Sequence, residues 1–258
     1  MRNCIEEEFE ASKEKMFKTI DNNGKLLVEL SRNNVAIVEA MIRNDSAYIR
    51  MKDVNAKPLY NTKNVLKYGG SSAYWMTRLK NVLIDGISCD EKTYEEIIKG
   101  AVEAVDRENS THLNSDNVGR AVIIKRICGF GREELVECLK NPDYKDMKLI
   151  AEISEKISDK KGARSNLSFA SKFCHYACFY LFEGTEYQDN YSIYDNILRN
   201  VLPLYLDYYK LHKYNLSDYR EYRKAVDSIR EAVEKTSGTE ISRNGLDHLL
   251  WYYHKGRM

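Results

Sequence analysis

Residues 166–198 read NLSFASKFCHYACFYLFEGTEYQDNYSIYDNIL, and this stretch decides the fold and the chemistry that we expect of the chain. Its first half has a strongly apolar helical pattern with one lysine, Lys172, and after a short loop Asp195 begins the next helix. Burial among aromatic neighbours would weaken a lysine's usual preference for the charged form. A neutral amine can attack a carbon atom, and a nearby carboxylate can transfer protons or stabilise a cation. The aromatic neighbours in the sequence are Phe169, Phe173 and Tyr176.

Each of these residues also has a simpler interpretation. Lys172, near a helix start, can extend its ammonium group to solvent, and Asp195 can act only as the N-terminal cap of its helix. A capping aspartate beside a helix N-terminus stays ionised, so capping and catalysis are compatible. His175 lies three residues after Lys172 on the same side of the helix, where it is either a satisfied core histidine or a proton shuttle.

The composition is that of a globular protein without a global attraction to polyanions. The chain has 258 residues, of which 43% are hydrophobic, and 40 basic side chains balance 39 acidic ones. Any nucleic-acid site must therefore be a local patch. The acidic amino terminus is unlike a signal peptide, and no apolar run approaches the roughly 18 residues of a membrane span. We expect a soluble, cytoplasmic protein without a membrane partner, and its six cysteines, which lack metal-like spacing, to be reduced and structural.

Few helix breakers and repeated helical patterns predict an all-α protein. Only three prolines and 13 glycines occur in the chain, and both residue types interrupt helices. In the clearest pattern, residues 88–106, Ser88 is the expected cap. Between residues 25 and 55 we favour helices, with a small β-hairpin as the alternative. The other expected helices span 2–20, 73–86 capped by Ser71 or Ser72, 118–128, 133–140, 147–158, the Lys172 helix, 195–209, 217–236 capped by Ser217, and 242–254.

The segment ASKFCHYACFYLFEGTEYQDNYSIYDNILRNVL resembles the catalytic stretch of the helix-hairpin-helix DNA glycosylase superfamily, particularly its 8-oxoguanine-glycosylase-like branch. In that family a hairpin leads into a helix with a nucleophilic lysine, and a Val/Ile-x-Asp motif at the next helix start carries the essential aspartate. Lys172 and the aspartate of IYD, Asp195, fall at the matching positions, 23 residues apart. The final LDHLLWYYHKG is similar to the closing helix of those folds. The resemblance covers about residues 160–258 and points to a divergent bacterial branch.

The resemblance implies a two-lobed helical fold and base excision with AP lyase chemistry on double-stranded DNA. A damaged nucleotide would be turned out of the duplex, Lys172 would attack the sugar carbon, and Asp195 would stabilise the developing cation and transfer protons. The covalent imine then allows strand scission by elimination, without a metal or a diffusible cofactor. Where the family has a Gly-x-Gly hairpin turn, this chain has the residues 165–168, so Ser168 at a helix N-terminus is the expected phosphate contact.

A locally basic stretch after Asp195 is a candidate surface for the nucleic-acid backbone, because its cations alternate with tyrosines. The alternative is a solvated helix surface whose tyrosines fill the core. The candidate cations are Arg199, Lys210, Lys213 and Arg220. Supporting residues behind the reacting pair are expected to be His175, Asp247, His248 and Trp251.

We expect residues 111–258 to form the glycosylase-like region and residues 1–110 to form an N-terminal helical region of unassigned role. Two other functions stay open: a catalytically silent relative that binds nucleic acid or a protein partner, in phage defence or a mobile element, and a helical interaction module unrelated to DNA. An enzyme needs Lys172 and Asp195 to face one cleft with basic walls, a silent binder needs only the walls, and an interaction module needs an exposed apolar surface. The target base, the choice between DNA and RNA, and the oligomeric state also stay open.

Overall fold

The computed structural model describes residues 16–43, 72–109, 111, 113, 118–157 and 165–255. These residues are mostly helical, and their sheet structure consists of one two-stranded hairpin, which confirms the all-α class. None of the described helices is both long enough and apolar enough to span a membrane.

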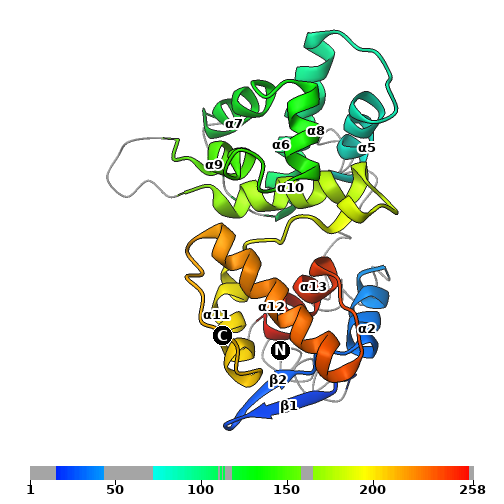
Figure 1. The fold of residues 1–258 in the computed structure, drawn as a ribbon. Coiled ribbons are helices and arrows are strands. Elements are labelled where there is room, and N and C mark those ends of the chain that lie inside the picture. Colours follow the sequence, from blue (N-terminus) through cyan, green and yellow to red (C-terminus); the bar gives the residue numbers. More distant parts are fainter. Residues whose placement is uncertain are drawn as a thin grey trace, which may run out of the picture. The chain divides into compact units, whose positions relative to one another are not determined.

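The chain forms two compact units (Figure 1). The terminal unit contains the described residues of 1–61 and 195–258, and the central unit contains those of 62–194. The division that we expected from the sequence, between residues 110 and 111, stays a prediction.

The central unit is built around the Lys172 helix, α10, which contacts four other helices and a short 3-10 helix (Figure 1). Ten of its 15 residues are buried, and its pattern is apolar on nearly all sides, as expected for a helix inside a core. Its neighbours explain this burial. The elements of the unit are α5 Ser72–Leu83, α6 Glu91–Asn109, α7 Val118–Cys128, α8 Arg132–Lys140, α9 Lys148–Ser154, α10 Leu167–Leu181 and the 3-10 helix η1 Glu186–Asp189.

A glycine allows α5 and α6 to pack closely. Gly100 lies in the middle of α6, and a Cβ atom at this position would overlap the indole ring of Trp75 on α5. The expected apolar stripe of α6 is confirmed, because all of its members are buried in this interface and in the core behind it. These members are Tyr94, Ile97, Ile98, Ala101, Val102 and Val105.

We predict that Gly100→Ala destabilises the protein by about 1–3 kcal/mol, the usual cost of overpacking, although alanine favours helix by about 1 kcal/mol over glycine. Urea denaturation measures the change. In a Trp75→Leu background the same substitution should cost much less, because the indole is gone. An equal cost in both backgrounds would contradict this packing argument.

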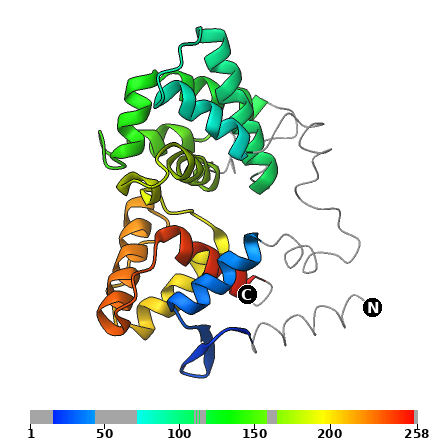
Figure 2. The same ribbon diagram turned by 90° about the vertical axis from the view of Figure 1, so that its right-hand side faces the viewer.

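The terminal unit joins segments from both ends of the chain. The hairpin and α2 pack against helices from the carboxyl-terminal half, and α2 runs beside α13 (Figure 2). Two hydrogen bonds connect the hairpin to α11: the hydroxyl of Tyr205 donates to the Val28 carbonyl at 2.8 Å, and the Asn22 amide donates to the Leu204 carbonyl at 3.1 Å. The elements are β1 Thr19–Asn22, β2 Lys25–Val28, α2 Arg32–Arg43, α11 Asn196–Tyr208, α12 Tyr219–Ser237 and α13 Arg243–His254.

The hairpin differs in position from the one that we considered. Its strands span 19–28, so the carboxyl-terminal end of the expected helix 2–20 is wrong at Thr19 and Ile20, and the described part of 25–55 is strand up to residue 28 and helix from 32. The turn at Asn23 and Gly24 has positive φ at both residues, the conformation that closes two-residue hairpins. Of the described residues 16–20, only residue 16 is helical, and residues 2–15 and 44–55 lie outside the described residues.

Three helix starts also differ from expectation, each by a few residues. The Asp90 carboxylate, not Ser88, accepts the Thr93 N–H at 2.7 Å at the start of α6. Asp218, not Ser217, caps α12. Ser72 lies inside α5 and donates its hydroxyl to Glu108 instead of capping, while Ser71 lies outside the described residues. The helix expected over 147–158 ends at residue 154. In the first two cases an aspartate one or two residues after the predicted serine is the cap, and aspartate and serine are about equally good caps.

Candidate active site

Lys172 is carried by the second helix of a helical hairpin, α9–α10. The last carbonyl groups of α9 accept hydrogen bonds from the residues directly before α10 and from Arg126 of α7. The Asn166 N–H and the Ser165 hydroxyl donate to the Ser154 carbonyl, both at 3.0 Å. The Glu155 carbonyl accepts from the Asn166 amide at 3.1 Å and from the Arg126 guanidinium at 2.8 Å. These bonds satisfy terminal carbonyls of α9 and set where α10 begins.

Lys172 lies in the second turn of α10 and is 9% exposed, so its expected burial is confirmed. It is the only lysine or arginine in this helix, whose sequence is otherwise apolar, hydroxyl-bearing, thiol or aromatic. Phe169 and Phe173, the aromatic neighbours one turn apart, stack on each other with ring centroids 6.1 Å apart. Both rings are buried in the helix that carries Lys172.

A buried segment, residues 191–194, follows η1 and Asn190 and lies against α10. The Tyr194 N–H donates to the Ser171 hydroxyl at 2.9 Å, and the Tyr191 carbonyl lies 2.9 Å from Nδ1 of His175. A carbonyl only accepts, so this nitrogen of His175 carries the hydrogen. His175 is 3% exposed, as expected for a satisfied core histidine, and it holds the segment that leads to Asp195.

Asp195 is the first residue of the terminal unit, and Lys172 belongs to the central unit. Asp195 is the N-cap of α11, where its carboxylate accepts the Ile197 N–H at 2.7 Å. The expected capping role is therefore confirmed. The two predicted catalytic residues each follow directly on one partner of the Ser171–Tyr194 hydrogen bond.

The predicted nucleic-acid-binding residues differ in their exposure. Ser168 is half-buried in the first turn of α10, and it does not cap that helix, whose N-cap residue is Asn166. Lys210 and Lys213 are exposed in the connection between α11 and α12, whereas Arg199 and Arg220 are half-buried on those helices. Among the described residues, neither Lys210 nor Lys213 forms an ion pair. The two lysines are thus available to a ligand.

Several tyrosines that alternate with these cations belong to the core instead. Tyr205 and Tyr222 are fully buried, and Tyr219 is 5% exposed. Tyr208 is the most exposed aromatic of this region, at 37%. These three tyrosines therefore fill the core, as in the alternative that we considered for this stretch.

The expected supporting residues of the last helix lie on α13 in the terminal unit. Asp247 is 7% exposed, and His248 is half-buried. The ammonium group of Lys255 lies 3.9 Å from the ring centroid of Trp251, a cation–π contact that covers one face of the half-buried indole.

The described cysteines are free thiols in non-reactive surroundings. Burial raises the pKa of Cys128 and of Cys138 to about 11, and it holds the pKa of Cys174 well above its ordinary value. A thiol that stays protonated is a poor nucleophile. This agrees with the structural role expected for the cysteines, and Cys4 lies outside the described residues.

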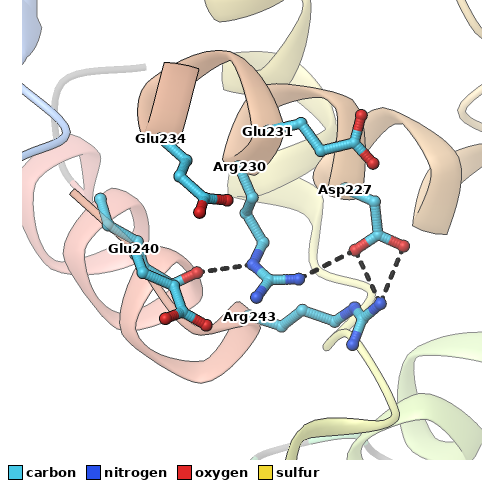
Figure 3. Close-up of a pocket in the computed structure, with 7 residues that line it drawn as sticks. Asp227, Arg230, Glu231, Glu234, Glu240 and Arg243 are labelled. Carbon is cyan, nitrogen blue, oxygen red and sulfur yellow. Dashed lines mark hydrogen bonds and ion pairs between the residues drawn. The ribbon is translucent and has the colours of Figure 1, made fainter. Parts of the chain in front are cut away.

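A polar pocket of about 230 Å³ in the terminal unit was not expected from the sequence (Figure 3). Asp227 accepts hydrogen bonds from Arg230 at 3.2 Å and from Arg243 at 2.8 Å, and Arg230 also donates to the Ile241 carbonyl at 2.6 Å. These contacts join α12 to the start of α13. The periodic pattern of a single helix does not predict contacts between side chains of two different helices. The remaining lining residues are Glu231, Glu234 and Glu240.

No protein-family model, curated protein or solved structure matches the chain.

The capping role of Asp195 can be separated from any chemical role. We predict that Asp195→Ala lowers the free energy of unfolding by about 1 kcal/mol, the usual value of an N-cap, whereas Asp195→Asn changes it by a few tenths because the amide oxygen still accepts the Ile197 N–H. Thermal unfolding measures both variants, and Asp218→Ala at the start of α12 is the matched cap control. An asparagine variant as unstable as the alanine variant would show that Asp195 stabilises the fold by more than capping.

Proposed function

We propose that this protein is a DNA base-excision enzyme with AP lyase activity, in which Lys172 is the nucleophile and Asp195 its electrostatic and proton-transfer partner. A nucleotide turned out of the duplex exposes its sugar to such a site. The Lys172 nitrogen forms a bond to the anomeric carbon while the bond to the base breaks, and the departing base takes up a proton. The bond between the anomeric carbon and the ring oxygen then breaks, the amine's proton passes to that oxygen, and a protonated imine forms. Loss of a proton from the neighbouring sugar carbon then breaks the carbon–oxygen bond to the 3′ phosphate by elimination.

The burial of Lys172 supports this proposal most directly. An ammonium group withdrawn from water loses hydration that the protein must replace, and apolar surroundings are a common setting for nucleophilic lysines. The Ser171–Tyr194 hydrogen bond adds a second argument, because it joins the residues directly before Lys172 and before Asp195. A protein that uses this lysine and this aspartate together needs such a connection.

The charges of α12 support a nucleic-acid-binding face in the terminal unit. Its first six residues include Arg220, Arg223 and Lys224, at the helix end where the dipole disfavours cations. Glutamates 231 and 234 lie toward the other end, where the dipole disfavours anions. Lys224 also pairs with Glu221 at 2.8 Å within the helix, so the phosphate contacts that we propose are those of Arg220 and of the exposed Lys210 and Lys213.

Borohydride trapping tests the proposed imine. We predict that the wild-type protein forms a covalent adduct with a duplex that contains 8-oxoguanine, uracil or an abasic site, and that Lys172→Gln forms none. Reduction fixes only an imine, so the adduct identifies an amine nucleophile. Lys235→Gln, which removes an exposed lysine near the end of α12, is the matched control and should form the adduct at the wild-type rate.

Other outcomes of the same experiment separate the alternatives. An adduct that persists in Lys172→Gln would assign the nucleophile to another amine. No adduct on any of the three duplexes, with DNA retained in a gel shift, would favour the catalytically silent binding protein. Loss of both adduct and binding would contradict the DNA function altogether.

The exposed lysines of the α11–α12 connection should account for part of the salt dependence of DNA binding. We predict that Lys213→Gln weakens binding of any duplex sequence and reduces the slope of log Kd against log salt by about 1, as expected when one phosphate contact is lost. Fluorescence anisotropy across a salt series measures the slope. Lys235→Gln should leave it unchanged, and a Lys210→Gln/Lys213→Gln protein with the wild-type slope would contradict the assignment of this face.

A further inference from the structure

Residues 190–194 are bound to two helices of the central unit, α8 and α10. The Tyr191 hydroxyl donates to the Cys138 carbonyl of α8 at 2.6 Å, and the Asn190 amide donates to the Leu139 and Lys140 carbonyls at 3.0 and 2.8 Å. On α10, Ser171 accepts the Tyr194 N–H and His175 binds the Tyr191 carbonyl. We call this second attachment the α10 clamp; it shares Tyr191 with the first attachment but uses the carbonyl instead of the hydroxyl.

The geometry of the α10 clamp follows from the spacing of its members. Ser171 and His175 are four residues apart, so they lie on one face of α10 about 6 Å apart along its axis. The two backbone groups that they bind, the Tyr191 carbonyl and the Tyr194 N–H, are separated by two extended residues, or about 7 Å. The segment therefore lies against the helix with both side chains in register, and it runs antiparallel to α10.

The Ser171 hydroxyl has both of its hydrogen-bonding roles defined. It donates to the Ser168 carbonyl at 3.1 Å and accepts the Tyr194 N–H at 2.9 Å. Ser171 is fully buried, and Tyr194 is 9% exposed. Since a buried N–H without a partner is costly, the Tyr194 backbone is held at one place on α10, one residue before Asp195.

We propose that Ser171 and His175 are positioning residues for the reaction, because the α10 clamp holds Tyr194, the residue directly before Asp195, against the helix that carries Lys172. This inference rests on the proposed function. Neither residue touches the reacting atoms in this scheme, and both act through the backbone of 191–194. A displacement of about 1 Å in such a pair is enough to slow a reaction about 100-fold.

The test compares variants that remove the clamp with variants that retain it. Ser171→Ala and His175→Leu remove the two contacts, whereas Ser171→Thr retains a hydroxyl and His175→Asn retains an N–H close to the position of Nδ1. We measure the single-turnover rate of borohydride-trapped adduct at saturating abasic duplex, and the Kd for the same duplex. Gly100→Ala, which perturbs the α5–α6 contact and leaves the hydrogen bonds of the clamp in place, is the control for lost stability alone.

The clamp predicts a rate lowered about 10- to 100-fold in Ser171→Ala and His175→Leu, a Kd within about threefold of wild type, and recovery of most of the rate in Ser171→Thr and His175→Asn. Gly100→Ala should keep the wild-type rate below its melting temperature. Wild-type rates in both clamp-removing variants, or equal losses in the control, would overturn the inference while leaving the proposed function in place.

Hydrogen exchange provides a readout that does not depend on catalysis. Amide exchange at 192–195 should accelerate at least tenfold in Ser171→Ala and His175→Leu, while exchange in α8 stays unchanged because the contacts of Asn190 and Tyr191 with α8 remain. Unchanged exchange would overturn the α10 clamp itself. If exchange accelerates in the two variants but the wild-type protein forms no adduct, the α10 clamp exists and the proposed chemistry is wrong. The positioning role would then be wrong as well.

Discussion

The burial of α10 is the constraint on which the central unit depends. A helix that is enclosed on nearly all sides must have its few polar side chains satisfied by the groups packed against it. Ser171 and His175 meet this requirement by binding the backbone of 191–194, and this pairing fixes the last residues of the central unit against α10. The same helix carries Lys172 into the interior. The packing of α10 therefore determines both the position of the candidate nucleophile and the point at which the chain leaves for Asp195.

The terminal unit depends on contacts between residues that are far apart in the sequence. The Asn34 amide donates to the Lys18 and Glu29 carbonyls at 2.8 and 2.9 Å, and its oxygen accepts the Lys18 N–H at 3.2 Å, so one buried side chain joins α2 to both ends of the hairpin. The Tyr205 hydroxyl then connects this assembly to α11 through the Val28 carbonyl. Burial raises the pKa of Tyr205 well above its ordinary value, so the hydroxyl stays a donor throughout the physiological pH range.

Local features were predicted from the sequence more successfully than long-range ones, and the reason is physical. The apolar stripe of α6 and the cap at Asp195 depend on residues within one or two turns, and both are confirmed. Asp90 and Ser88 are both good caps and lie two residues apart. Which of them caps α6 depends on the residue at which the helix begins, and here the Asp90 carboxylate accepts the Thr93 N–H. The closure of the terminal unit and the α12–α13 pocket depend on side chains that meet only after folding. Helical periodicity carries no signal for such contacts, so neither was predicted.

The same limit applies to the candidate site. The sequence placed Lys172 in an apolar helix and Asp195 at a helix start, because both are local properties, but it contained no sign that the residues before them are hydrogen-bonded. This contact bears on the choice between enzyme and silent binder. Leucine is the more common core residue and an equally good helix former, so the lysine at this buried position of α10 is the residue to test first. The burial of Lys172 and the α10 clamp are the two observations on which the proposed lysine–aspartate pair depends.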